Sequence, residues 1–280
     1  MREGGLAGET ARDLIIRLHH ERQMISEARK MDGLSQCPAL ILVGGLGTRL
    51  RPVYADGPKA LAPIQGKPFL AYLLKMLAEQ GISRVVLCVG HRAGEIERWL
   101  AEQSSLERSL SLDVRCSYED EPLGTAGALG LAYSRHARGE RVLAMNGDSI
   151  LRMSLAAMWE LHAGRAAEAT IALAHVADTS RYGNVEVNDE GWVSRFSEKS
   201  AEREPGFING GVYMFEPSVM DRVVEDRNVS LEREVLRAQL TRGLLAFKSD
   251  GYFIDIGVPQ DLFRAQSELP AETYDVRVIP

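Results

Sequence analysis

The sequence has few cysteines, few aromatic residues and no long apolar run. Among 280 residues there are three cysteines, Cys37, Cys88 and Cys116, and their odd number and wide spacing predict neither a disulfide framework nor a zinc site. No stretch approaches the roughly 20 apolar residues that a membrane-spanning helix needs. The N-terminus has no apolar core of the signal-peptide type. We therefore expect a cytoplasmic protein without a membrane partner.

A surplus of basic residues is also missing. The chain has 33 Lys and Arg against 39 Asp and Glu, a net charge of −6, which argues against a general nucleic-acid or membrane-surface binder. Phosphorylated substrates stay compatible, because a few local cations and backbone amides can hold a phosphate. Glycine is plentiful, with 26 residues often in short clusters, and such clusters let a backbone approach a ligand closely. This composition predicts a soluble α/β enzyme.

Residues 1–36 differ from the remainder of the chain. From Thr10 onward, apolar residues fall near helical spacing with charged residues between them, and Asp32-Gly33 is a plausible end of the helix. We expect an N-terminal helical extension that packs on the body of the protein or on a partner subunit of a homo-oligomer. It contains no residues that suggest chemistry.

From residue 38, short apolar segments alternate with amphipathic ones. Such alternation predicts a Rossmann-like, mainly parallel mixed sheet with helices on both faces, and ligands beyond the carboxyl ends of its strands. The predicted strands are Ala39–Val43, Val85–Val89, Leu112–Tyr118 and Arg141–Met145, and the predicted helices are Pro68–Gln80, Ala93–Leu100 and Thr125–Arg135.

The second half of the chain is richer in predicted β-structure. Asn188-Asp189-Glu190-Gly191 reads as a hairpin turn between Val185–Val187 and Trp192–Phe196, and Phe207–Phe215 and Gly251–Ile256 are further candidate strands. No linker separates this small β-rich lobe from the parallel half. We therefore expect one domain over residues 37–280, whose first half, to about residue 150, is mainly parallel and whose second half, about 151–268, is a mixed sheet.

The strongest motif directly follows the first predicted strand. It runs Val43-Gly44-Gly45-Leu46-Gly47-Thr48-Arg49-Leu50. Its glycines expose consecutive backbone N–H groups to phosphate oxygens, and a hydroxyl, a guanidinium and, ten residues later, Lys59 can add to them. A Walker loop would need lysine directly after Gly47, and a dinucleotide fingerprint would need glycine where Leu50 stands.

Two acidic residues stand at strand ends or inside strands. Asp148 follows the apolar strand that ends in Met145, and Asp255 interrupts the apolar segment Phe253–Ile256. A carboxylate at the carboxyl end of a strand faces the ligand crevice of such sheets. Two converging carboxylates can hold Mg²⁺, which typically takes one or two of them together with substrate phosphates.

With these motifs the chain from about residue 38 to 268 resembles the sugar-1-phosphate nucleotidyltransferases (NDP-sugar pyrophosphorylases). Within that family it is most similar to the D-glycero-D-manno-heptose 1-phosphate guanylyltransferases. The supporting segments are Glu119–Gly127, Arg181–Gly183, Glu198-Lys199, Ile208–Tyr213, Ser230–Glu232 and Phe253–Pro259. Val43 departs from the alanine that is common in the family, which bears on the identity of the base rather than on activity.

The resemblance implies a nucleotidyltransferase domain over residues 37–280, with a nucleotide half at about 37–150 and a sugar-phosphate half at about 151–268. It also implies a role for each motif. Arg49, Lys59 and Asp148 would be catalytic, and Asp148 and Asp255 would bind Mg²⁺. The implied nucleotide-binding residues are Val43, Gly44, Gly45, Gly47, Thr48, Glu119, Gly124 and Thr125. The implied sugar-phosphate-binding residues are Gly183, Glu198, Lys199 and Asn209.

Each motif also has a purely structural interpretation. The glycine loop could be a tight turn carrying a surface arginine, and Asp148 and Asp255 could be a turn residue and an edge charge. The other structural alternatives are a solvated Glu198-Lys199 pair, a strand bend at Asn209–Gly211, an N-cap at Ser230 and a loop anchor at Arg181.

The implied reaction joins an NTP to a sugar 1-phosphate and releases pyrophosphate, with GTP and a manno-heptose 1-phosphate preferred. Glu119 favours GTP because its carboxylate can accept hydrogen bonds from N1–H and N2–H of guanine. Three alternatives stay open at this point: another NTP with a hexose 1-phosphate, a non-catalytic regulatory subunit that binds sugar nucleotides, and an NAD-dependent oxidoreductase.

Overall fold

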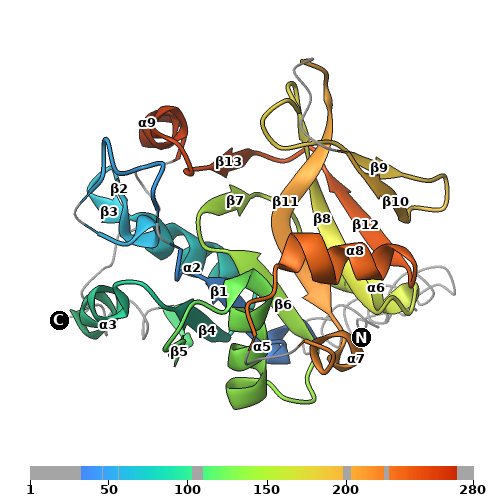
Figure 1. Ribbon diagram of the computed structural model, residues 1–280, viewed down its shortest axis with the longest axis horizontal. Helices are drawn as coiled ribbons and strands as arrows, with labels where there is room; N and C mark the ends of the chain where they lie inside the picture. Colours follow the sequence, from blue (N-terminus) through green and yellow to red (C-terminus); the bar gives the residue numbers. More distant parts are fainter. Residues whose placement is uncertain are drawn as a thin grey trace, which may run out of the picture.

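The computed structural model describes residues 33–45, 47–55, 57–102, 110–197, 203–223 and 227–269 (Figure 1). Most of the predicted N-terminal helical extension therefore lies outside the described residues. No helix within these ranges combines the length and the apolar character that crossing a bilayer requires.

A seven-stranded sheet forms the centre of the described chain, in the order β12-β8-β11-β6-β1-β4-β5 (Figure 1). Its strands are β1 (Ala39–Leu42), β4 (Arg84–Val89), β5 (Asp113–Tyr118), β6 (Val142–Asn146), β8 (Ala169–Val176), β11 (Gly206–Phe215) and β12 (Leu244–Ser249). All of them run in one direction except β11, which pairs antiparallel with both β6 and β8. The predicted mainly parallel mixed sheet is confirmed.

Helices cover both faces of this sheet because its buried side chains alternate between two apolar cores. One core includes residues of α2 (Phe69–Glu79), α3 (Ala93–Glu102), α6 (Leu155–Gly164) and α9 (Pro259–Glu268). The opposite core includes residues of α5 (Gly124–His136), α7 (Pro217–Met220), η2 (Leu231–Val235) and α8 (Leu236–Leu240). Within one strand, Ala39 and Ile41 enter the first core and Leu40 enters the second, as the two-residue period of a strand requires.

Shorter elements complete the molecule. They are η1 (Lys59–Leu61), the hairpin β2 (Pro63–Ile64) with β3 (Lys67–Pro68), the pair β7 (Ser149–Leu151) with β13 (Phe253–Asp255), and the hairpin β9 (Val185–Val187) with β10 (Val193–Phe196). The β9–β10 hairpin confirms the predicted turn and lies beside β12 (Figure 1). The strand predicted near Gly251–Ile256 forms as β13, which pairs with β7 outside the central sheet.

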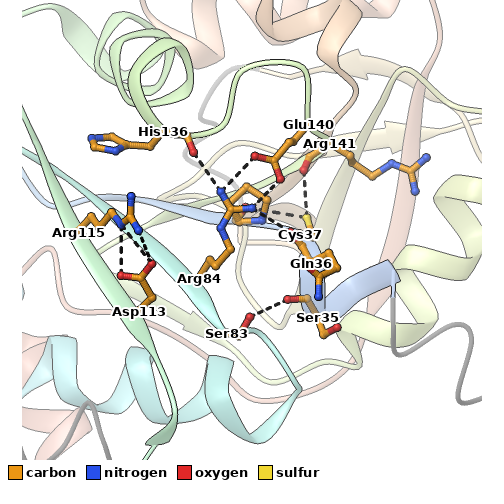
Figure 2. Close-up of polar contacts among 11 residues, drawn as sticks. Ser35, Gln36, Cys37, Ser83, Arg84, Asp113, Arg115, His136, Glu140 and Arg141 are labelled. Atoms are coloured by element: carbon orange, nitrogen blue, oxygen red, sulfur yellow. Dashed lines mark hydrogen bonds and ion pairs between the residues drawn. The ribbon is translucent and has the colours of Figure 1, made fainter.

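The amino ends of the parallel strands are tied together by a polar network (Figure 2). Arg84 donates to both carboxylate oxygens of Glu140, at 2.6 and 3.1 Å, and to the carbonyl oxygen of His136 at 3.1 Å. The Ser83 hydroxyl donates to the carbonyl oxygen of Ser35 at 2.8 Å. Burial raises the pKa of the Cys37 thiol to about 12, so this cysteine stays protonated at neutral pH. The network holds the segment before β1 at the amino-terminal end of the sheet, opposite to the carboxyl ends of the strands.

In the segment before β1, the side chain of Leu34 is 1% exposed and packs in the first core. We predict that Leu34→Ala lowers the free energy of unfolding by about 2–5 kcal/mol, because it removes buried methyl groups and leaves a cavity. Chemical denaturation monitored by circular dichroism measures this. The control Val53→Ala, at a side chain that is 43% exposed, should change the value by less than about 0.5 kcal/mol. Equal effects of both variants would contradict the described packing.

Candidate active site

The candidate site lies at the carboxyl ends of β1 and β6, where the order of the sheet reverses direction. The chain leaves β1 toward β4 on one side and later returns as β6 on the other, and ligands of open α/β sheets bind at such a switch point. The two loops are joined directly, because Gly147 N donates to Leu42 O at 2.9 Å. A Cβ atom on Gly147 would lie 2.5 Å from that oxygen, so this close approach requires glycine.

Three charged side chains converge beside these loops. The Lys59 ammonium group forms an ion pair with Asp148 and lies 3.7 Å from Oδ1 of Asp255. Each comes from a different segment: Lys59 begins η1, Asp148 follows β6, and Asp255 ends β13. The pairing of β13 with β7 places Asp255 opposite Ser149, and Ile256 N donates to Asp148 O at 2.9 Å. The predicted convergence of the two acids is present in the structure.

The surroundings of Asp255 favour additional positive charge. Burial, and after it the neighbouring Asp148 carboxylate, raise the pKa of Asp255 above its ordinary value. Lys59, the Gly257 amide and Arg49 act in the opposite direction, and Gly257 N donates to Oδ1 at 2.6 Å. Two partly buried carboxylates at short range thus need cations near them to stay ionised together.

A cavity of about 360 Å³ opens beside this cluster. It is lined by eight of the predicted nucleotide-binding or catalytic residues, namely Val43, Gly44, Gly45, Lys59, Glu119, Gly124, Thr125 and Asp148. Gly47, Thr48 and Arg49 lie in the adjoining turn rather than in the cavity wall, and the last two are exposed. Gly47 has a φ of +57°, which a glycine adopts without strain.

Glu119 is held in a fixed orientation at one end of this cavity. Leu123 N donates to its Oε2 at 3.1 Å, and burial raises the pKa of the carboxyl group. A Cβ atom on Gly90 would lie 2.2 Å from Oε1, and one on Gly44 would lie 3.1 Å from it. The two glycines therefore leave the space that the carboxylate occupies.

A second cavity of about 460 Å³ lies between the β9–β10 hairpin and the segment that leads into α8. Gly183 and Asn209, two predicted sugar-phosphate-binding residues, line it. The Asn209 amide donates to the Tyr213 hydroxyl at 2.8 Å and its oxygen accepts from Gly211 N at 3.0 Å, across an irregularity in β11. Asn209 thus both supports the strand bend and faces the cavity. Glu198 and Lys199 lie outside the described residues.

Several residues of the second cavity were not predicted from the sequence. They are Asn184, Glu232, Arg233 and Arg237. The segment Ser230–Glu232 contributed to the resemblance, but it gave no signal for a role of Glu232. Ser230 does cap its helix, because its hydroxyl accepts from Arg233 N at 3.2 Å. Arg181 anchors its loop through an ion pair of 2.6 Å with Asp261 of α9.

Comparison with known proteins places this arrangement in a family. The nucleotidyl transferase family model matches residues 38–272. The chain is 39% identical over 232 residues to D-glycero-alpha-D-manno-heptose 1-phosphate guanylyltransferase of Aneurinibacillus thermoaerophilus, a match that covers 82% of this chain and 97% of that protein. It is 34% identical to mannose-1-phosphate guanylyltransferase of Mycobacterium tuberculosis, over 84% of this chain and 65% of that protein.

A solved structure agrees with these sequence matches. HddC from Yersinia pseudotuberculosis, crystallised in complex with GMP-PN, superposes with a TM-score of 0.71 at 29% identity. The match covers 84% of this chain and all of that one. The chain therefore belongs to the nucleotidyl transferase family, and the protein is a nucleotidyltransferase.

Proposed function

We propose that the enzyme transfers a guanylyl group from GTP to a manno-heptose 1-phosphate, which yields a GDP-sugar and pyrophosphate. The observation that carries the proposal is the convergence of Lys59, Asp148 and Asp255 beside a glycine-loop cavity that adjoins the second cavity. The names of the relatives from Aneurinibacillus and Mycobacterium support a sugar 1-phosphate and a guanine nucleotide as substrates.

The first cavity is proposed to hold GTP. Backbone amides from Gly44 to Thr48 would surround the triphosphate, and Arg49 in the adjoining turn would contact its outer phosphates. Glu119, oriented by the Leu123 amide, would accept hydrogen bonds from N1–H and N2–H of guanine. Gly124 and Thr125 at the start of α5 would lie beside the ribose.

The two aspartates fit a bound Mg²⁺ ion. Magnesium prefers oxygen ligands and is typically held by one or two carboxylates together with substrate phosphates, and Asp148 and Asp255 supply that donor set. Within the described residues no cluster of three or more metal-ligating side chains competes with them. When bound, the ion would neutralise charge on the phosphates of the nucleotide.

The second cavity is proposed to hold the sugar 1-phosphate. An oxygen of its phosphate attacks the α-phosphorus of GTP in line, and the bond to the bridging oxygen breaks so that pyrophosphate leaves with the electron pair. The attacking oxygen is already ionised at neutral pH, so no protein base is needed. Lys59 would stabilise charge on the transferred group, and Lys199 would bind the sugar phosphate. Gly183, Glu198 and Asn209 would contact the sugar, and catalysis follows from orientation and charge neutralisation.

This division assigns nucleotide binding to residues 37–150 and sugar-phosphate binding to residues 151–268, without a chemical role for residues 1–36. The similarity to mannose-1-phosphate guanylyltransferases makes mannose 1-phosphate the second candidate acceptor.

The substrate preference of the enzyme is directly testable. With Mg²⁺ present, pyrophosphate release should occur with GTP and a manno-heptose 1-phosphate, and should be at least tenfold slower with ATP, CTP, UTP or dTTP. A coupled pyrophosphate assay over all pairs of NTP and hexose or heptose 1-phosphate measures this. Preference for another pair would keep the reaction and refute these substrates, whereas no release with any pair would favour a non-catalytic sugar-nucleotide-binding protein.

The role of the acidic pair is testable by substitution. The double variant Asp148→Asn/Asp255→Asn should release pyrophosphate at least about 100-fold more slowly, because it removes the charge that would bind Mg²⁺. The thermal midpoint of unfolding, measured in parallel, shows whether the variant is folded. Asp189→Asn, in the exposed β9–β10 turn, is the matched control and should keep full activity. A folded double variant with unchanged turnover would refute the metal assignment.

Recognition of the base by Glu119 is testable in the same way. Glu119→Gln should raise KM for GTP by about 10–100-fold, because loss of hydrogen bonds to a charged group removes about 1.5–3 kcal/mol. The preference for GTP over the other NTPs should shrink accordingly. Glu121→Gln, at a neighbouring exposed carboxylate, should change neither value. An unchanged order among the NTPs in Glu119→Gln would show that another group recognises the base.

A further inference from the structure

One acidic side chain lines both cavities. Glu232 forms part of the wall of the 360 Å³ cavity beside Thr125, and part of the wall of the 460 Å³ cavity beside Asn209. No other residue in the described part of the chain contributes to both walls. Glu232 therefore stands at the junction across which the two proposed substrates must meet.

The local backbone fixes this position. Glu232 is the second residue of η2, a short π-helical segment that packs against α5 and continues into α8, which contacts β10 (Figure 1). The Ser230 hydroxyl caps η2 at its start. Segments of π-helix are rare in proteins, and many of those that occur lie at functional sites.

Two hydroxyl groups orient the Glu232 carboxylate through one of its oxygens. Thr125 Oγ1 accepts from Leu231 N at 2.8 Å, so its own proton is available for Glu232 Oε2 at 3.2 Å. Ser230 Oγ likewise accepts from Arg233 N and donates to the same oxygen at 3.2 Å. Oε1 accepts no hydrogen bond from the residues that the structure describes. The carboxylate is thus held by one oxygen and has acceptor capacity left on the other.

The charge of this group selects what it can bind. A carboxylate repels phosphate groups and accepts hydrogen bonds from hydroxyl groups. The residues that follow Glu232 along the helix and line a cavity, Arg233, Leu236 and Arg237, all belong to the second cavity only. The wall that carries Glu232 is therefore mainly a wall of the second cavity.

The buried Tyr213 hydroxyl relates Glu232 to the catalytic cluster. Burial is the main cause that raises the pKa of Tyr213, and the Glu232 and Asp148 carboxylates add to it. The same hydroxyl accepts from the Asn209 amide. The Glu232 and Asp148 carboxylates thus both act on the Tyr213 hydroxyl, and Glu232 shares the wall of the second cavity with Asn209.

We propose that Glu232 is a specificity-determining residue that accepts a hydrogen bond from a ring hydroxyl of the sugar 1-phosphate and so orients the sugar at the junction of the two cavities. The inference rests on the proposed function, and it concerns a residue to which the family resemblance assigned no role.

Steady-state kinetics of Glu232→Gln test the proposal. The amide oxygen of glutamine can still accept hydrogen bonds from the Thr125 and Ser230 hydroxyl groups. The amide nitrogen takes the place of Oε1, and it donates hydrogen bonds instead of accepting them. We expect KM for the sugar 1-phosphate to rise about tenfold and KM for GTP to change less than twofold. Glu234→Gln is the matched control, because its carboxylate accepts from Ser230 N on the same helix and lines neither cavity.

Monodeoxy analogues of the sugar 1-phosphate identify the hydroxyl. The wild type should lose about tenfold in kcat/KM with the analogue that lacks the bound hydroxyl, and Glu232→Gln should lose less than twofold with that same analogue. A rise in KM for GTP instead, together with lost discrimination against 2′-deoxy-GTP, would assign Glu232 to the ribose and overturn the proposal. Unchanged kinetics would overturn it too. If the wild type turned over no pair of substrates, the proposed function itself would fail.

Discussion

The arrangement of the site depends on one cation held between two carboxylates. Lys59, Asp148 and Asp255 come from three segments separated by about 90 to 110 residues, and their side chains are 12%, 37% and 22% exposed. Two partly buried carboxylates that contact the same ammonium group repel each other, and the positive charge of that group offsets the repulsion. The glycine loop, η1 and the β7–β13 pair all have to be in place before these groups can meet.

The fold separates the demands of stability from those of binding. At the amino ends of the strands, Arg84 and its partners join β4, the α5–β6 connection and the segment before β1. At the carboxyl ends, loops and short paired strands surround two adjoining cavities. Within the described part of the central sheet, β11 runs antiparallel to its neighbours; it carries Asn209, which lines the second cavity, and Tyr213, whose hydroxyl accepts from Asn209. One sheet thus supplies both a rigid frame and the floor of the site.

Features carried by local sequence were predictable. The glycine loop and Asp148 each come just after a short apolar strand. Because ligands of α/β sheets bind at the carboxyl ends of the strands, both could be predicted to lie at the ligand site. The hairpin around Asn188–Gly191 was predictable from its turn residues. The segment Gly251–Ile256 was predicted as a strand, but the partner strand β7 is three residues long and gives no periodic signal of its own.

Features that depend on distant contacts were not predictable. The strands β8 and β12 were not predicted although they are apolar, because the pairing that distinguishes buried strands is not local. The helix α6 was not predicted either, although its cap Ser154 is a local signal. The Glu232 carboxylate is oriented in part by Thr125, more than 100 residues earlier in the chain. Its own neighbours in sequence suggest no more than a capped, charged helix.

The central claim is that a phosphate oxygen of a sugar 1-phosphate displaces pyrophosphate from GTP at the Lys59–Asp148–Asp255 cluster. Phosphorus-31 NMR of the enzyme with GTP, a manno-heptose 1-phosphate and Mg²⁺ tests it most directly. The sugar-phosphate resonance should disappear while the two resonances of a nucleoside diphosphate sugar and that of pyrophosphate grow in equal molar amounts, and Asp148→Asn/Asp255→Asn should abolish this change. Orthophosphate and GDP formed with an intact sugar 1-phosphate would contradict it, because the bond broken would then be at the γ-phosphorus.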